Sequence, residues 1–306
     1  MSGRPQMREG SWAQYVDMRS VQRRVWPHWT SLRVNTCELI GPSANRVVRV
    51  VLFERLEPGE PTQLAPAFIP RHRNSYDVLS VSLKLPIPGS SVDPLEPLGG
   101  ELIYRPECLL SEAMPGPVPV PPEEHVEVNI YLHTEGPSGA PMITLDQIET
   151  CVAKLDRDHP GRLMLERGEY LQDGGIVREA LEVCWEEIHN RPMIYSELPA
   201  VSAPVIFPIP ATPWSSFPDR TGTEVKRFAA IKNTGVSMEL LRLDEGASLP
   251  SEVLGPSRFV AVLAGRIRYN DQTLDDLSVI FGGPSQKFGR IHAENRSLLW
   301  AVNWED

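Results

Sequence analysis

The chain has 306 residues, of which 41% are hydrophobic, and its formal net charge at pH 7 is -10. This length can form one large or two ordinary domains with a sizeable core. The acidic balance argues against a nucleic-acid or anionic-membrane surface, because both need clustered Lys and Arg. No segment approaches the roughly 18 apolar residues of a membrane-spanning helix, so no membrane partner is expected.

The four cysteines, Cys37, Cys108, Cys151 and Cys184, are far apart and form no CxxC pair. In a chain of this size the spacing predicts reduced thiols and a cytoplasmic protein.

Residues 1–30 are polar with scattered aromatic side chains, and we interpret them as an arm that packs on the body or on another subunit. Residues 31–142 are predicted to form a β domain, because 46–54, 76–85 and 127–133 carry strong strand patterns. Both a β-sandwich and a barrel fit this region. The proline-rich run 115–122 is predicted to be extended, with a stiff strap favoured over a partner ligand.

Residues 143–198 are predicted to form a helical insert. Thr144 and Gln147 have the spacing of a capping box, and apolar residues follow at helical intervals. A second helix is predicted from about 176 to 189 and ends before Pro192. Residues 199–218 carry six prolines and are predicted to be an ordered linker.

Residues 219–306 are predicted to form a small β-barrel. Strand patterns rich in branched and aromatic residues occur at 237–243, 259–263, 266–269, 278–281 and 297–302, each bounded by Gly, Pro, Asn or Asp. Short strands at this spacing are typical of a sandwich or a barrel.

Two segments of this barrel carry a family resemblance. Residues 244–250 and 260–265 resemble the first motif of the RmlC-like cupin superfamily, and their sequence is most similar to the cupin domain of ChrR-type anti-sigma factors. In that family a His-x-His pair and a Glu precede the Val-Leu-x-Gly turn. Counting back from Gly265, these ligand positions fall on Glu252, Leu254 and Arg258. The second motif resembles 275–284. Its usual His falls near Gln286, and His292 lies six residues later.

The resemblance therefore implies a cupin-like barrel whose metal ligands are not matched. A divalent metal needs converging imidazoles and carboxylates, which Leu254 and Arg258 cannot supply. We expect no metal in this barrel and no cofactor, with iron or another divalent metal elsewhere as the alternative. The N-terminal β domain is interpreted as a β-sandwich or as a second, degenerate cupin, which would make the chain a bicupin. Because cupin pairs bury strand edges against each other, we also expect a homodimer.

A separate candidate metal cluster lies in the N-terminal β domain. His125, Glu127 and His133 share one face of the strand pattern, and His72 could join them from another strand. An ordinary solvent-exposed polar face is the competing interpretation.

Seven polar residues of the C-terminal barrel are predicted to line a pocket: Glu252, Arg258, Arg268, Tyr269, Gln286, Arg290 and His292. His292 is the candidate catalytic acid or base, because it alone in this set titrates near neutrality. The arginines favour an anionic small-molecule ligand. A surface histidine and solvated charge are the competing interpretations.

Three functions remain open at this point. The first is a metal-free, cupin-like ligand-binding or regulatory protein. The second is a cupin enzyme, either an iron-dependent oxygenase using the N-terminal cluster or a cofactor-free isomerase or epimerase using His292. The third is a structural or assembly protein. The sequence decides neither the ligand nor whether the protein is an enzyme.

Overall fold

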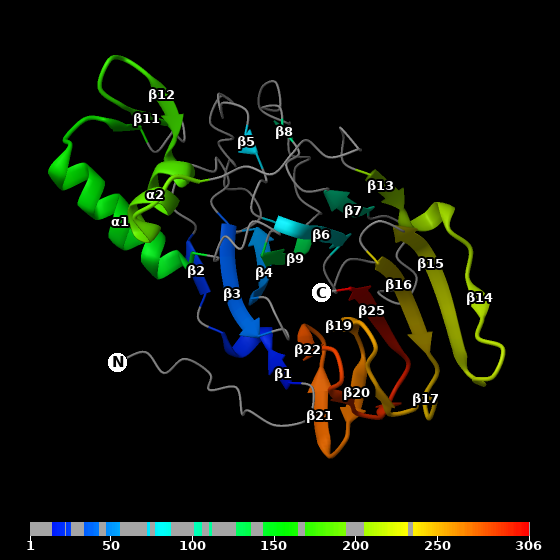
Figure 1. Ribbon diagram of the computed structural model, residues 1–306. Helices are drawn as coiled ribbons and strands as arrows, with labels where there is room; N and C mark the ends of the chain where they lie inside the picture. The colour runs from blue at the N-terminus through cyan, green and yellow to red at the C-terminus, as the bar shows by residue number, and fades with distance from the viewer. Residues whose placement is uncertain are drawn as a thin grey trace.

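The structure is a computed structural model that describes residues 14–21, 23–25, 34–42, 47–55, 72–73, 77–86, 101–105, 110–111, 127–135, 143–164, 169–193, 205–231 and 235–305. For many residues of the N-terminal strands it describes the backbone alone. The described strands build two β domains, and a small helical unit projects from the end of the N-terminal one (Figure 1). The predicted mainly β fold, with a helical insert between two β regions, is confirmed.

The C-terminal barrel consists of two facing sheets. Among the described residues, the large sheet has seven antiparallel strands in the order β1 (Gln14–Asp17), β22 (Ser278–Gly282), β19 (Ser257–Ala264), β25 (Ser297–Trp304), β16 (Val236–Leu243), β15 (Thr223–Ile231) and β14 (Ser215–Ser216). The small sheet has the order β17 (Ser248–Leu249), β24 (Ile291–Ala293), β20 (Arg266–Tyr269) and β21 (Gln272–Asp275), and β18 (Glu252–Val253) pairs with β23 (Lys287–Phe288). Every strand predicted from 237 to 302 is present.

The large sheet is buried on both faces. In β19, Val260 and Val262 point into the barrel, whereas Phe259 and Leu263 belong to a second cluster on the outer face. A strand covered on both sides needs an almost continuous apolar sequence, which explains why residues 259–264 show no polar alternation.

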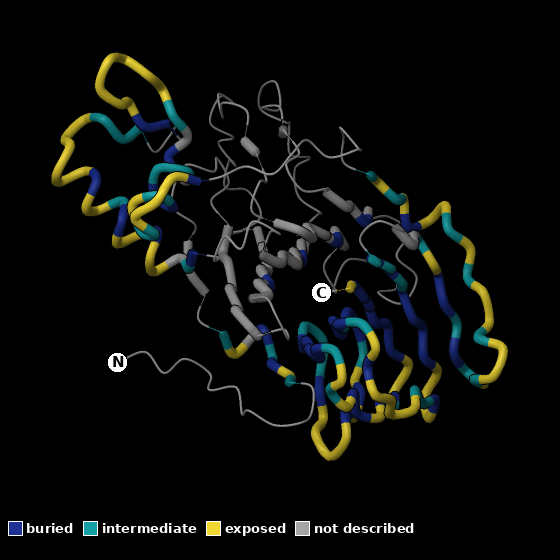
Figure 2. Tube along the Cα trace, viewed as in Figure 1, coloured by how far each residue is buried: buried dark blue, intermediate teal, exposed yellow. Residues whose placement is uncertain are grey.

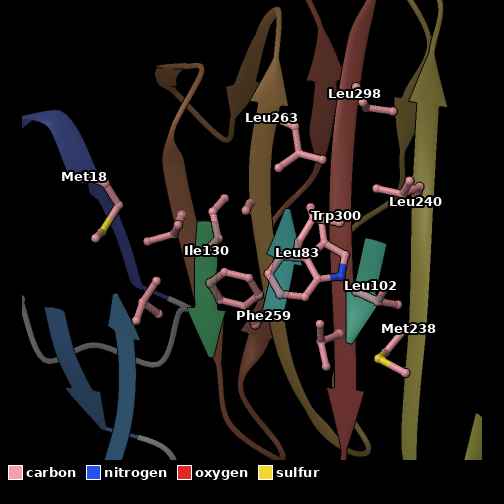
Figure 3. Close-up of a cluster of buried hydrophobic side chains, with 14 of the residues drawn as sticks. Met18, Leu83, Leu102, Ile130, Met238, Leu240, Phe259, Leu263, Leu298 and Trp300 are labelled. Carbon is pink, nitrogen blue, oxygen red and sulfur yellow. The ribbon is translucent and has the colours of Figure 1, made fainter. Parts of the chain in front are cut away.

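The outer cluster joins the two β domains. It combines the large C-terminal sheet with Val50, Leu83, Leu102 and Ile130 from the N-terminal sheet. Figure 3 shows the labelled side chains of both sheets gathered around Phe259 and Trp300. Because the cluster is formed by both domains, each domain covers apolar surface of the other.

The N-terminal sheet has seven strands within the described ranges, in the order β13 (Val205–Pro208), β7 (Glu101–Arg105), β6 (Asp77–Pro86), β9 (Glu127–Glu135), β4 (Val47–Arg55), β3 (Val34–Pro42) and β2 (Arg23–Val25). A separate pair is formed by β5 (His72–Arg73) and β8 (Leu110–Ser111). The strands predicted at 46–54, 76–85 and 127–133 correspond to β4, β6 and β9. The extended run predicted at 115–122 lies outside the described residues.

Two strands are exchanged between the domains. β1, at the start of the chain, pairs antiparallel with β22 of the C-terminal sheet, and Gln14 lies opposite Phe281. β13 lies in the segment predicted to be a linker and pairs with β7 of the N-terminal sheet. A short 3-10 helix, η1 (Met18–Ser20), follows β1, and η3 (Ile209–Ala211) follows β13. The arm and the linker each therefore complete a sheet edge.

The helical unit has its own small core. It contains α1 (Leu145–Asp158), β10 (Leu163–Met164), β11 (Glu169–Leu171), β12 (Val177–Glu179) and α2 (Ala180–His189). The predicted capping box is confirmed: the Gln147 N–H donates to the Thr144 hydroxyl, and Thr144 N–H donates to the Gln147 side chain. None of the helices in the described ranges has the length and apolar character needed to cross a membrane.

The prediction that the second helix begins near 176 was wrong. Residues 177–179 form β12, which pairs with β11, and helix α2 begins only at Ala180. Gly174 and Gly175 both have positive φ and form the turn that returns the chain as a hairpin. Ile176 and Val177 are consequently exposed and do not join the apolar stripe of α2. Figure 2 shows the exposed stretch of the hairpin between β11 and β12.

Candidate functional site

The interior of the C-terminal barrel is filled with apolar side chains. Both sheets contribute to this core, which contains Leu241, Leu243, Leu254, Val260, Val262, Ile267, Tyr269, Leu274, Ile280, Phe288, Ile291 and Leu299. Within the described part of the chain, no three His, Cys, Asp or Glu residues are grouped so that they could hold a metal ion. The polar candidates must therefore be located relative to this packed interior.

The positions that match the cupin ligands hold a side-chain network of this chain's own. Leu254 is 4% exposed and belongs to the barrel core. Arg258 pairs with the Glu252 carboxylate through Nη1 and donates from Nε to the Asn303 side-chain oxygen at 2.6 Å. Its guanidinium carbon also lies 5.5 Å from the centre of the Phe288 ring. A fixed guanidinium at this end of the barrel repels a cation.

Gln286 also has a local structural partner. Its side-chain oxygen accepts a hydrogen bond from the Gly283 N–H at 2.8 Å, and its carbonyl accepts one from Leu254 N–H at 3.0 Å. The residue thus closes the turn that leads into β23.

Tyr269 is part of the barrel core. It is 1% exposed, and its hydroxyl accepts a hydrogen bond from the Gly289 N–H at 2.9 Å. Burial raises the pKa of Tyr269 above that of an ordinary tyrosine, and the Gly289 hydrogen bond only partly opposes this effect. The phenol therefore stays protonated at neutral pH.

The remaining three candidates lie on the outer face of the small sheet. In β24, Ile291 and Ala293 point inward, and the alternation of the strand turns His292 outward. His292 lies opposite Arg268 of β20 on one side and opposite Ser248 of β17 on the other. The Ser248 hydroxyl lies 3.0 Å from His292 Nδ1, and Arg290 Nη2 donates to the same hydroxyl at 3.0 Å.

We call Ser248, Arg268, Arg290 and His292 the outer-face cluster. Arg268 also approaches Glu294, with 3.6 Å between Nε and Oε1. Sequence reasoning missed Ser248, although its place one residue before the inward-facing Leu249 was a signal that it faces outward.

The predicted seven-residue pocket is thus divided by the fold. Tyr269 lies in the core, Gln286 lies in a turn, and Arg258 with Glu252 lies at one end of the barrel. Arg268, Arg290 and His292 come together, but on the outside. Residues of one strand alternate between the two faces of the sheet, so polar residues close in sequence are separated.

The N-terminal candidates are only partly described. His72 lies in β5, opposite Ser111 of β8, whereas Glu127 and His133 lie in β9. His133 is paired in register with Arg49 of β4 and Ser80 of β6. His125 lies outside the described residues, as do the side chains of the other three, so the proposed metal cluster remains a prediction.

Comparison with known proteins supports the fold. No family model and no curated protein matches the chain. A solved structure from Nostoc punctiforme, provisionally described as a dioxygenase, matches over 97% of this chain and 84% of its own, with 10% identity and a TM-score of 0.50. HEPD from Streptomyces albus, solved with 2-hydroxyethylphosphonate and Fe(II), matches over 92% of this chain and 75% of its own, with 12% identity and a TM-score of 0.44.

A third match is the complex of SigE with the anti-sigma ChrR from Rhodobacter sphaeroides. It covers 31% of this chain and 50% of that chain, with 13% identity and a TM-score of 0.27. At these identities the likeness concerns the fold alone. The C-terminal barrel has a cupin-like fold, as its motif residues predicted, and the Nostoc structure matches the fold of this chain over 97% of its length.

Proposed function

We propose that this chain is a metal-free, cupin-like binding or regulatory protein that takes a small anionic ligand at the outer-face cluster. The observation that carries the proposal is that Ser248 and Arg268 flank His292 on neighbouring strands and Arg290 bonds to Ser248, while the barrel interior is packed with apolar side chains. The proposed ligand site therefore lies on the outer surface of the barrel and not in its interior.

The chemistry of the outer-face cluster suits a carboxylate or a phosphate. A guanidinium presents a planar fork of N–H donors that matches two anionic oxygens. Among the described residues, Arg290 donates to the Ser248 hydroxyl and has no carboxylate beside it to neutralise its charge. Ser248 and His292 add hydrogen-bonding groups beside it.

The absence of metal chemistry from the C-terminal barrel is part of the same proposal. Arg258 and Leu254 stand at two of the matched ligand positions; Arg258 is paired with Glu252, and Leu254 lies in the barrel core. We expect purified protein to contain well below one metal ion per chain. Loss of metal-dependent chemistry is consistent with a binding role in the cytoplasm.

Thermal unfolding with added anions tests the binding site. Inorganic phosphate or citrate should raise the melting temperature of the protein, because a ligand that binds only the folded state stabilises it. Arg290→Gln should abolish the rise. Arg266→Gln is the matched control, since Arg266 lies on the same sheet but pairs with Asp275. An equal rise in both variants, or none with either anion in the parent protein, would contradict the proposal.

A second candidate is an iron-dependent oxygenase with ligands in the N-terminal domain. The observation favouring it is that Ile130 of β9 packs in the cluster between the domains. Strand alternation assigns positions 127 and 133 to the opposite face, where a barrel would have its interior. Near-stoichiometric iron that is lost in Glu127→Gln and His133→Ala would favour this candidate over a metal-free protein.

The homodimer stays a prediction of the sequence. Light scattering on the purified chain would decide it.

A further inference from the structure

The helical unit brings together two cysteines from different helices. Cys151 lies in α1 and Cys184 in α2, and both belong to one small core with Leu155 and Tyr170. They are 4% and 0% exposed, and neither is in a disulfide. The function proposed above does not involve the helical unit, so a role for Cys151 and Cys184 would be separate from it.

The Cys151 thiol lies against the backbone of Cys184. Cys151 Sγ donates to the Cys184 carbonyl oxygen at 3.8 Å, and both cysteine side chains lie in the same small core. The neighbouring Cys184 side chain, and to a smaller extent the charge of Lys154, holds the pKa of Cys151 below its ordinary value, although burial and Glu187 act in the opposite direction. A larger thiolate fraction makes a cysteine more nucleophilic toward oxidants.

We infer that Cys151 and Cys184 form a reversible disulfide that links α1 to α2 when the protein meets a peroxide. The Cys151 thiolate attacks one peroxide oxygen and becomes a sulfenic acid, and the other oxygen leaves as hydroxide. The Cys184 sulfur then attacks the Cys151 sulfur, and the sulfenic hydroxyl leaves as water. Overall, two thiols and one hydrogen peroxide give one disulfide and two waters.

Burial determines when this reaction occurs. Peroxide must reach Cys151 through a local opening of the two helices, because both sulfurs are shielded in the closed unit. The bond, once formed, joins positions 33 residues apart and encloses the β11–β12 hairpin. It therefore limits further opening of the helical unit and leaves the two β domains untouched.

The test uses the full chain carrying Cys37→Ser and Cys108→Ser, so that only the inferred pair can react. After hydrogen peroxide treatment and alkylation under denaturing conditions, we expect both thiols to be protected and the intact mass to fall by two hydrogen atoms. Dithiothreitol should reverse both changes. Adding Cys184→Ser should abolish the mass loss and leave Cys151 alkylated or carrying one added oxygen.

Two results would overturn the inference. One is full alkylation of both thiols after peroxide treatment of the folded protein. The other is formation of the disulfide only in denaturant, which would mean that the fold holds the sulfurs apart. Both readouts use the protein with the pair intact, so neither depends on the Cys184→Ser variant folding.

Discussion

Arg258 and Glu252 form an ion pair at one end of the C-terminal barrel, six residues apart in the chain. The same guanidinium donates to Asn303 of β25 and lies against Phe288, so it connects β18, β19, β23 and β25. It occupies the part of the barrel where the cupin motif would place a metal ligand.

Replacing Arg258 by Met should destabilise the protein by roughly 1–3 kcal/mol, because the nearly buried Asn303 loses its Nε donor. Urea unfolding measures the change. Arg266→Met is the control, since its pair with Asp275 is exposed and such pairs contribute about 0–1 kcal/mol. A smaller loss for Arg258→Met than for Arg266→Met would show that the network is not a stabilising element.

Gly265 should not tolerate a side chain. Its φ is +91°, and an added Cβ would lie 2.5 Å from the Arg296 carbonyl oxygen. Gly265→Ala should therefore cost about 1–2 kcal/mol of backbone strain, with a further cost of about 1–3 kcal/mol from the clash. Gly174→Ala separates the two effects, since its φ is +82° but nothing lies within 4 Å of the added Cβ. Equal melting temperatures for the two variants would refute the clash.

Trp300 stabilises the contact between the two β domains. It is fully buried, and its ring packs edge-on against Phe259 with 5.4 Å between centroids. Trp300→Ala should cost about 3–5 kcal/mol. Urea unfolding monitored by circular dichroism measures this loss of stability. Val253→Ala, at an exposed position, is the control, and its free energy of unfolding should lie within about 0.5 kcal/mol of the parent value. Two separate transitions in the parent protein would argue against a shared core.

Tyr269 should make the protein sensitive to alkaline pH. Because burial raises its pKa in the folded state, its contribution to stability is present below the ordinary tyrosine pKa of about 10 and is lost as pH rises through the folded value. Tyr269→Phe should remove this alkaline dependence. It should also lower stability at neutral pH by about 1–3 kcal/mol, since the Gly289 N–H loses its acceptor. Melting temperatures at several pH values between neutral and strongly alkaline would show whether the two curves have different slopes.

The sequence predicted those elements that carry a local signal. The strands from β16 to β25 are bounded by turn residues, and the capping box at Thr144 depends on residues three apart. Residues 176–179 were misassigned because a short apolar run fits both helical and strand periods. The hairpin is determined by the pairing of β12 with β11. The spacing of apolar residues along the sequence carries no information about that pairing.

The candidate site was harder to predict, for a related reason. Whether Arg268 and Tyr269 face inward or outward depends on which residue of β20 first points toward the core. An error of one residue in that position assigns every side chain of the strand to the wrong face of the sheet. The pairing of β1 with β22 was also not predictable, since four residues carry little signal for a partner so distant in the chain. From the sequence, the side-chain network around Arg258 could be recognised only because Arg258 does not match the metal ligand expected at its position in the cupin motif.

The exchanged strands have a consequence for how this protein is made. On the ribosome, β1 is made long before its partner β22, because both β domains' other described strands up to β21 lie between them in the chain. The C-terminal sheet cannot be completed before then, and the N-terminal sheet must wait for β13. Contacts so distant in sequence form slowly. Newly made chains would therefore keep an unpaired sheet edge exposed until β22 has been synthesised, and a chaperone would matter most during that interval.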